Sequence, residues 1–156
     1  LIAEVEEVYY SKGSNYEYAP VGYVIKQEPA SGSSIAEGST VKIYVNKGFS
    51  ANITVNLPSD LKLEQYYVSL WADGVAVAES KMLDATQLSK YTFENVTSKR
   101  DSGTYTVKIR SASSNALDYQ VLTVDFKEGT AKRVGSYDDY KKLDADTSSS
   151  DNEDFN

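Results

Sequence analysis

Tyrosine side chains are the residues of this sequence best suited to contact a ligand, and they crowd towards one end. The chain has 13 tyrosines in 156 residues. Six of them lie within residues 1–48, namely Tyr9, Tyr10, Tyr16, Tyr18, Tyr23 and Tyr44. So short a stretch cannot bury six rings, and we expect several to be exposed, where an aromatic face can stack on a sugar. Tyrosine also suits strand edges, so a purely structural role stays open.

Catalytic chemistry has no support in the sequence. The chain contains no histidine and no cysteine. This excludes disulfides and thiolate chemistry, and it removes the commonest zinc ligand and the commonest general base. Neighbouring acids occur at Glu6 and Glu7 and at Asp138 and Asp139, but they lie in charged runs with nothing to bury them. We therefore predict no catalytic residue, no metal site and no cofactor.

Charge and hydropathy exclude two further classes of partner. The net charge is −7 and the isoelectric point is about 4.6, which argues against binding to nucleic acid or to an anionic membrane surface. No apolar run is long enough to span a membrane. We predict an extracellular protein with no direct membrane contact in these residues.

The stretch 22–48 has the pattern of two strands joined by a polar loop. Tyr23–Gln27 is rich in β-formers, follows a glycine and stops before Pro29. In the second run Val41, Ile43 and Val45 alternate with polar residues, which predicts a strand with one apolar face. Upstream, Glu4–Tyr10 is rich in valine and tyrosine and predicts another strand.

The same stretch resembles the C-terminal half of a PASTA domain, a module repeated outside the membrane on bacterial serine/threonine kinases and on some penicillin-binding proteins. The residues that fill the family pattern in order are Gly22, Val24, Gln27, Pro29, Gly32, Gly38, Ser39, Val41, Val45, Lys47 and Gly48. A complete module begins with a strand and a helix, and a chain that opens at Leu1 leaves no room for that helix. We therefore expect a piece of a longer protein, with any signal peptide or anchor upstream.

Residues 51–129 predict a second, all-β unit. Six or seven short runs of β-forming residues separated by turn signals are typical of a small sandwich. Within it, the run Asp101-Ser-Gly-Thr-Tyr-Thr-Val107 resembles the tyrosine corner of immunoglobulin-like domains, which implies a structural role for Tyr105. Trp71, near the end of a predicted strand, is expected in the core. The run Tyr91-Thr-Phe-Glu-Asn-Val96, followed by Gly103-Thr-Tyr-Thr-Val107, is equally similar to prealbumin-like repeats of bacterial surface proteins.

These observations predict a mainly β chain, made of a partial PASTA β-unit and an immunoglobulin-like β-sandwich. The predicted boundaries are 1–48 for the PASTA unit, 51–129 for the sandwich and 130–156 for a polar acidic tail. We expect the last Ser/Asp/Asn-rich residues to lack fixed structure in isolation.

The resemblance implies a non-catalytic, cell-surface module that binds peptidoglycan fragments, from the ectodomain of a membrane serine/threonine kinase. The ligand contacts are expected on the polar face of the PASTA unit, at Tyr23, Lys26, Glu28, Lys42 and Tyr44. The lysines would pair with a stem-peptide carboxylate, the glutamate with an amine, and a tyrosine would stack on sugar. The alternatives are a structural spacer or adhesin-type surface domain, and the accessory tail of a penicillin-binding protein.

One expectation concerns the apolar face of the PASTA unit. A complete module covers Val41, Ile43 and Val45 with a helix. Without that cover, each side chain would expose apolar surface that costs roughly 1.5–3 kcal/mol to leave in water. We expect a substitute cover from the sandwich, the tail or a second copy of the chain, so self-association through this face is predicted.

Overall fold

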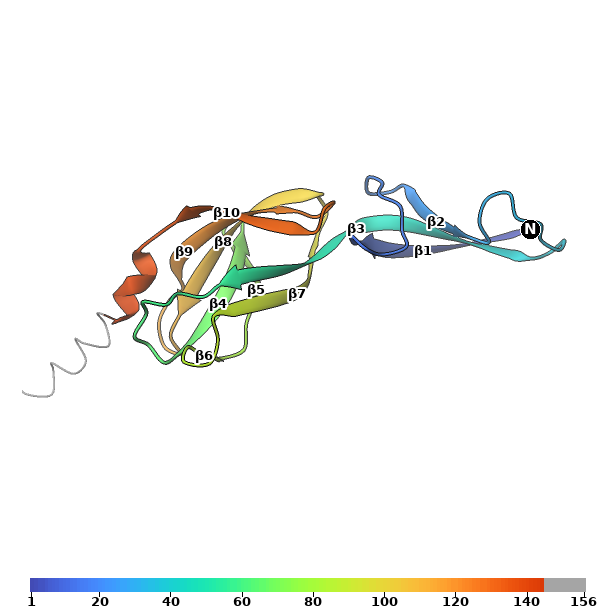
Figure 1. Ribbon diagram of the computed structural model, residues 1–156. Helices are drawn as coiled ribbons and strands as arrows, with labels where there is room; N and C mark the ends of the chain where they lie inside the picture. The colour runs from blue at the N-terminus through green and yellow to red at the C-terminus, as the bar shows by residue number, and fades with distance from the viewer. Residues whose placement is uncertain (145–156) are drawn as a thin grey trace, which may run out of the picture. The chain divides into compact units, whose positions relative to one another are not determined.

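The computed structural model describes residues 1–144 and is built almost wholly of strands (Figure 1). In chain order the strands are β1 (Ile2–Tyr10), β2 (Val24–Glu28), β3 (Thr40–Asn56), β4 (Gln65–Ala72), β5 (Val75–Glu79), β6 (Leu83–Asp84), β7 (Lys90–Ser98), β8 (Ser102–Arg110), β9 (Leu117–Asp125) and β10 (Thr130–Ser136), followed by a 3-10 turn, η1 (Asp139–Lys141). The predicted mainly β fold is confirmed. Among the described residues no helix is long or apolar enough to cross a membrane.

The chain divides into two compact units that share some strands. Unit 1 comprises Leu1–Ala51, Asn95–Ser102 and Asp125–Thr130. Unit 2 comprises Asn52–Glu94, Gly103–Val124 and the residues from Ala131 onward. The 17-residue strand β3 therefore contributes its first part to unit 1 and its last part to unit 2.

Unit 1 is organised around the first part of β3. This strand pairs in parallel with β1 and antiparallel with β2, giving the order β1-β3-β2. Tyr10, Ile25 and Phe49 are buried. Tyr10 packs edge-on against both Tyr18 and Phe49, with ring centroids 5.6 and 6.1 Å apart. Aromatic edges and faces thus fill a core that has few aliphatic residues.

A buried asparagine fixes the loop before β2. Asn46 is 1% exposed, and its side-chain amide donates to the carbonyl of Ala19 at 2.8 Å. Its side-chain oxygen accepts from the backbone N–H of Gly48 at 3.0 Å. A buried amide with both ends satisfied costs little and orients the chain segments that it joins.

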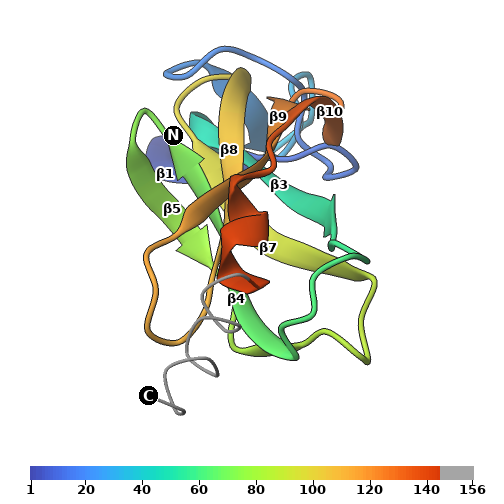
Figure 2. The ribbon, with the colours of Figure 1, turned by 90° about the vertical axis from the view of Figure 1, so that its left-hand side faces the viewer.

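Unit 2 contains two layers with an apolar core between them. One sheet has the order β10-β9-β8-β4-β5, and β6 pairs with β4. The end of β3 pairs with β7. Figure 2 shows β4 and β5 on one side of this unit and β3 and β7 on the other. The fully buried apolar side chains of the core are Ile53, Tyr66, Val68, Leu70, Val107 and Ile109, each 0% exposed.

The core position expected for Trp71 is wrong. Strand β4 alternates, and its inward residues are Tyr66, Val68 and Leu70. Successive side chains of a strand point to opposite faces, so Trp71 falls on the outer face with Tyr67 and is only half-buried. Tyr105, in contrast, is buried at 5% exposure.

The predicted tail begins later than expected. Residues 130–136 form β10, an edge strand paired with β9. Backbone hydrogen bonds along one side hold this edge strand, and nearly all of its side chains are exposed. The sequence therefore lacks the alternating apolar residues that would have predicted a strand here. Tyr140 and Leu143 are also buried, and the Tyr140 ring meets Tyr119 edge-on at 4.9 Å. The expectation for the Ser/Asp/Asn-rich end covers residues 144–156, of which 145–156 lie outside the described residues.

The apolar face of unit 1 is covered unevenly. Val41 is buried at 8% exposure, whereas Ile43 and Val45 are half-buried. Beside them Val5 and Val24, which pair with Ile43 and Val45, are 63% and 55% exposed. A single chain therefore covers this apolar face only in part.

Candidate functional site

The polar face of unit 1 gathers aromatic and charged side chains from three strands. In the register of β2 against β3, Lys26 lies opposite Tyr44 and Glu28 opposite Lys42. On the other side of β3, Glu6 of β1 lies beside Tyr44. Side chains that are opposite each other in a sheet share a face, so these residues form one continuous surface.

Two tyrosine rings form the centre of this surface. The rings of Tyr16 and Tyr44 lie 5.8 Å apart between centroids, tilted by 39°. The ammonium of Lys26 lies 5.6 Å from the Tyr44 centroid and 6.0 Å from that of Tyr16. The ammonium of Lys42 lies 5.6 Å from the Tyr44 centroid. These are the distances of cation–π contacts, so the cations and rings hold one another in place. We call Tyr16, Lys26, Glu28, Lys42 and Tyr44 the tyrosine platform.

Carboxylates surround the two lysines of the platform. Lys26 pairs with Glu28 at 3.3 Å, and Lys42 pairs with Glu6 at 3.4 Å. Because all four side chains are partly open to solvent, each pair contributes little to stability and can exchange partners at low cost. A charged ligand can therefore replace either carboxylate.

Hydrogen bonding ties Glu28 to the central ring. The Tyr44 hydroxyl and then the Lys26 ammonium lower the pKa of Glu28 below its usual range. The same bond to Glu28 raises the pKa of Tyr44, so the phenol stays protonated and donates. The carboxylate of Glu6 raises the pKa of Lys42. At neutral pH the platform thus presents fixed ammonium and carboxylate groups beside two neutral rings.

Of the five side chains predicted as ligand contacts, the structure brings four together. Tyr23 is 63% exposed and takes part in none of these ring or cation contacts. Two neighbours were missed, Tyr16 and Glu6. Glu6 had a detectable signal, because a strand at Glu4–Tyr10 next to β3 places alternate acids on the polar face. Tyr16 had none, since it lies in a loop whose position depends on the bond from Glu17 N–H to the Ile25 carbonyl, 3.0 Å.

The outer face of the large sheet in unit 2 carries a second set of aromatic–cation contacts. The Lys108 ammonium lies 4.4 Å from the Trp71 ring and pairs with Asp118 at 3.5 Å. The Arg110 guanidinium lies 4.1 Å from the Tyr67 ring. It also donates to both oxygens of Glu79, at 2.8 and 2.9 Å. This bidentate pair uses the guanidinium N–H groups that would otherwise bind a ligand. The charged groups of this face are therefore paired with one another, and Arg110, its strongest donor, is already occupied.

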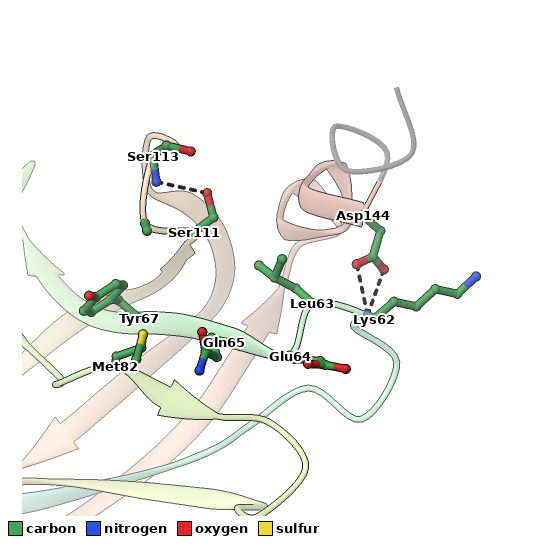
Figure 3. Close-up of a pocket in the computed structure, with 10 residues that line it drawn as sticks. Lys62, Leu63, Glu64, Gln65, Tyr67, Met82, Ser111, Ser113 and Asp144 are labelled. Carbon is green, nitrogen blue, oxygen red and sulfur yellow. Dashed lines mark hydrogen bonds between the residues drawn. The ribbon is translucent and has the colours of Figure 1, made fainter. Parts of the chain in front are cut away.

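A hollow lies in unit 2 near the start of β4 (Figure 3). Its volume is about 640 Å³. The backbone N–H of Lys62 donates to both carboxylate oxygens of Asp144, at 3.0 and 3.1 Å, and Figure 3 shows that Asp144 points towards it. Ser111 accepts from the backbone N–H of Ser113 at 3.4 Å. These polar groups bond to each other rather than converging on a common point, so the hollow does not form a binding site by itself.

Residues 2–47 match the family model described as the PASTA domain. We call residues 2–47 the PASTA domain below, because they match that family model. The resemblance stated from residues 22–48 is thereby confirmed and extends upstream through β1. The PASTA domain is the part of the chain that carries the tyrosine platform. A search of curated proteins gives no match.

One solved structure is similar to the chain, described as "X-ray structural studies of the entire extra-cellular region of the Ser/Thr kinase PrkC from Staphylococcus aureus". The sequence identity is 21% and the TM-score is 0.23. The alignment covers 86% of this chain and 43% of that one, so the chain spans less than half of the length of that protein. Within the described part of the chain, no group of three or more acidic side chains is placed to hold a metal ion.

Proposed function

We propose that the PASTA domain binds soluble peptidoglycan fragments through the tyrosine platform, as part of the extracellular region of a membrane serine/threonine kinase. The observation that carries this proposal is the convergence of two rings, two ammonium groups and a carboxylate on one partly exposed face. A muropeptide offers the complementary groups, because its sugars have apolar faces and its stem peptide carries carboxylates and an amine.

Each platform residue has a separate role in this proposal. The faces of Tyr16 and Tyr44 receive a sugar ring. Lys26 and Lys42 pair with stem-peptide carboxylates, and Glu28 pairs with the amine. Because each contact is exposed and must displace an existing ion pair, we expect weak affinity, with a Kd of about a millimolar.

The experiment is an NMR titration of the ¹⁵N-labelled chain with a soluble muropeptide. Amide shifts are expected for β2, for β3 up to Lys47 and for the loop around Tyr16. Tyr44→Leu should weaken binding about tenfold by removing the central ring. The control is Tyr23→Leu, the same substitution at a more exposed tyrosine of the same domain outside the cluster, which should change Kd less than about twofold. Shifts confined to unit 2, or equal losses in both variants, contradict the proposal.

Within the same proposal, unit 2 is an immunoglobulin-like spacer that carries no ligand site. The support is the strand order, in which β4 lies between β5 and β8 while β3 pairs with β7. This corresponds to the C′-C-F-G and B-E pairings of immunoglobulin-type sandwiches. An experimental structure in which β4 pairs with β3 instead of β8 would favour the prealbumin-like alternative.

Weak self-association through the apolar face of the PASTA domain completes the proposal. Exposed Val5 and Val24 beside half-buried Ile43 and Val45 support it. Light scattering over a concentration series should show a rising mass, and Val5→Lys should suppress it because a charge would be desolvated at the contact. A constant monomer mass at about 1 mM would overturn this part alone.

A further inference from the structure

A second hollow lies in unit 1, away from the tyrosine platform. Its volume is about 440 Å³. Its lining consists of Tyr18, Pro20, Val21, Phe49, Lys99, Arg100, Asp101 and Ser102. The apolar part of this lining comes from the aromatic core at the end of the PASTA domain, where Tyr18 stacks on Phe49 with ring centroids 6.0 Å apart.

The ring of Tyr18 is held from two sides. Its hydroxyl donates to the carboxylate of Asp101. The backbone carbonyl of Asp101 in turn accepts from the N–H of Phe126 at 2.7 Å, which fixes the turn that carries the acid. The ammonium of Lys127 lies 4.6 Å from the centroid of the Tyr18 ring. The Asp101 carboxylate is therefore hydrogen-bonded, and the Tyr18 ring is fixed in place.

The cations around this hollow are not matched by carboxylates. Lys99, Arg100 and Lys127 form no ion pair with any described carboxylate, whereas the lysines of the tyrosine platform both do. Lys99 instead donates to the backbone carbonyl of Lys47 at 3.0 Å, which positions its ammonium. The Arg100 backbone N–H is bonded to the Ser98 hydroxyl at 3.0 Å, and its side chain is exposed. Lys99 and Arg100 line the hollow and Lys127 lies over its Tyr18 ring, so three cations outnumber the two nearby acids, Asp101 and Asp125, and the local field is positive.

We propose that this hollow binds a small organic anion in which a carboxylate or phosphate adjoins a sugar ring or an aliphatic group. The Arg100 fork and the Lys99 ammonium bind the oxyanion, because a guanidinium matches the two oxygens of either group. Tyr18 and Phe49 provide the apolar floor for the adjoining ring. Asp101 keeps its negative charge, because a neutral phenol donor stabilises a carboxylate without neutralising it, and the cations at the hollow must outweigh its repulsion. The site shares no residue with the tyrosine platform, so binding at the hollow can be tested separately from binding at the platform.

The test is an NMR titration of the ¹⁵N-labelled full chain with three probes. These are N-acetylglucosamine 1-phosphate, N-acetylmuramic acid and uncharged N-acetylglucosamine. We expect amide shifts at Tyr18, Phe49 and residues 98–102 with one or both anions, and at most about a third of that affinity for the neutral sugar. A response to the phosphate alone identifies a phosphorylated sugar, and a response to the acid alone identifies a carboxylated one. Added salt at about 0.5 M should weaken either.

Matched arginine variants separate charge recognition at the hollow from bulk charge. Arg100→Gln should raise Kd at least about threefold. Arg133→Gln removes the same charge from β10 in unit 2 and should leave Kd unchanged. Both variants remove an exposed side chain, and their amide spectra report whether they fold. The proposal is overturned if neither anion shifts these amides at about 20 mM, if the neutral sugar binds equally well, or if the two variants behave alike.

Discussion

The two parts of strand β3 follow the same alternating pattern and reach different depths of burial. In unit 2, Ile53 and Val55 are 0% and 1% exposed, whereas the alternate residues Asn52, Thr54 and Asn56 are exposed. In unit 1, Val41 is buried, but Ile43, Val45 and the alternating Lys42 and Tyr44 are all half-buried. Period-2 alternation thus predicts which way a side chain faces, while burial depends on what lies over that face.

This difference has a functional counterpart. Where a second layer covers the strand, the apolar side chains supply stability and the outer face is polar. Where the sheet has three strands, rings and ion pairs occupy the polar face and remain accessible. The three-stranded sheet of unit 1 therefore buries less apolar area than the two layers of unit 2, and it leaves more of its surface accessible to a ligand.

A glycine in the unit 1 part of β3 provides the largest expected effect. Gly48 has a φ of +155°, and a Cβ there would lie 2.7 Å from the carbonyl oxygen of Ser98 and 3.0 Å from the Tyr9 ring. Gly48→Ala forces a backbone oxygen to move, so unfolding free energy should fall by about 3 kcal/mol. Gly135→Ala is the control, because the nearest atoms to its Cβ, those of Val121, lie at an ordinary 3.7 Å. Urea unfolding followed by circular dichroism compares them, and equal losses would show that the close approach is relaxed without cost.

A matched pair of valines tests the difference in burial directly. Val55→Ala removes buried methyl groups and leaves a cavity, so it should cost about 2–3 kcal/mol. Val45→Ala makes the same change in a half-buried position of the same strand and should cost about 1 kcal/mol or less. Hydrogen exchange of amides in each unit gives the two values separately, which matters because the units need not unfold together. Equal costs would mean that Val45 is covered in solution, as self-association requires.

The sequence predicts the strands and the polar face well because both depend on local alternation. Lys26, Glu28, Lys42 and Tyr44 lie on β2 and β3, and pairing alone brings them together. The position of Tyr16 depends on a loop closed by contacts distant in sequence. Trp71 was misplaced because side-chain size suggested a core residue, whereas the phase of β4, set by Tyr66, Val68 and Leu70, puts it outside. Phase along a strand is therefore a safer guide than residue type.

Each unit also has a tyrosine whose hydroxyl donates to an aspartate, and the two differ in burial. Tyr140 is 6% exposed and donates to Asp60 at 2.9 Å, and burial raises its pKa. Tyr18 is 36% exposed and donates to Asp101. Tyr140→Phe should cost about 1–2 kcal/mol, because the buried ring loses a part-buried hydrogen bond to a charged acceptor. Tyr18→Phe should cost under about 0.5 kcal/mol, since water replaces the hydroxyl. Thermal unfolding of both variants measures the difference, and a reversed order would contradict the burial argument.

The smallest expected effect compares two glutamates, one in each unit, whose pKa values are lowered by different partners. The Arg110 guanidinium lowers the pKa of Glu79, and the Tyr44 hydroxyl is the main cause of the lowered pKa of Glu28. A carboxyl with a lowered folded pKa adds stability that is present above its unfolded pKa and lost as pH falls through the folded value. Both contributions should therefore be complete at neutral pH, begin to be lost near pH 4.5, the value for a free glutamate, and be gone once pH falls below the lowered folded pKa.

Carboxyl ¹³C shifts followed through an acid titration measure both glutamates in one sample. Arg110→Gln should raise the pKa of Glu79 towards 4.5 and leave that of Glu28 in place. Tyr44→Phe should do the reverse, although Lys26 continues to hold the pKa of Glu28 somewhat below 4.5. If either substitution moves both values, the two faces are electrostatically coupled and the units cannot be treated as independent sites. Separate responses would show that the tyrosine platform owes its charge arrangement to its own hydrogen bonds, as ligand exchange at that face requires.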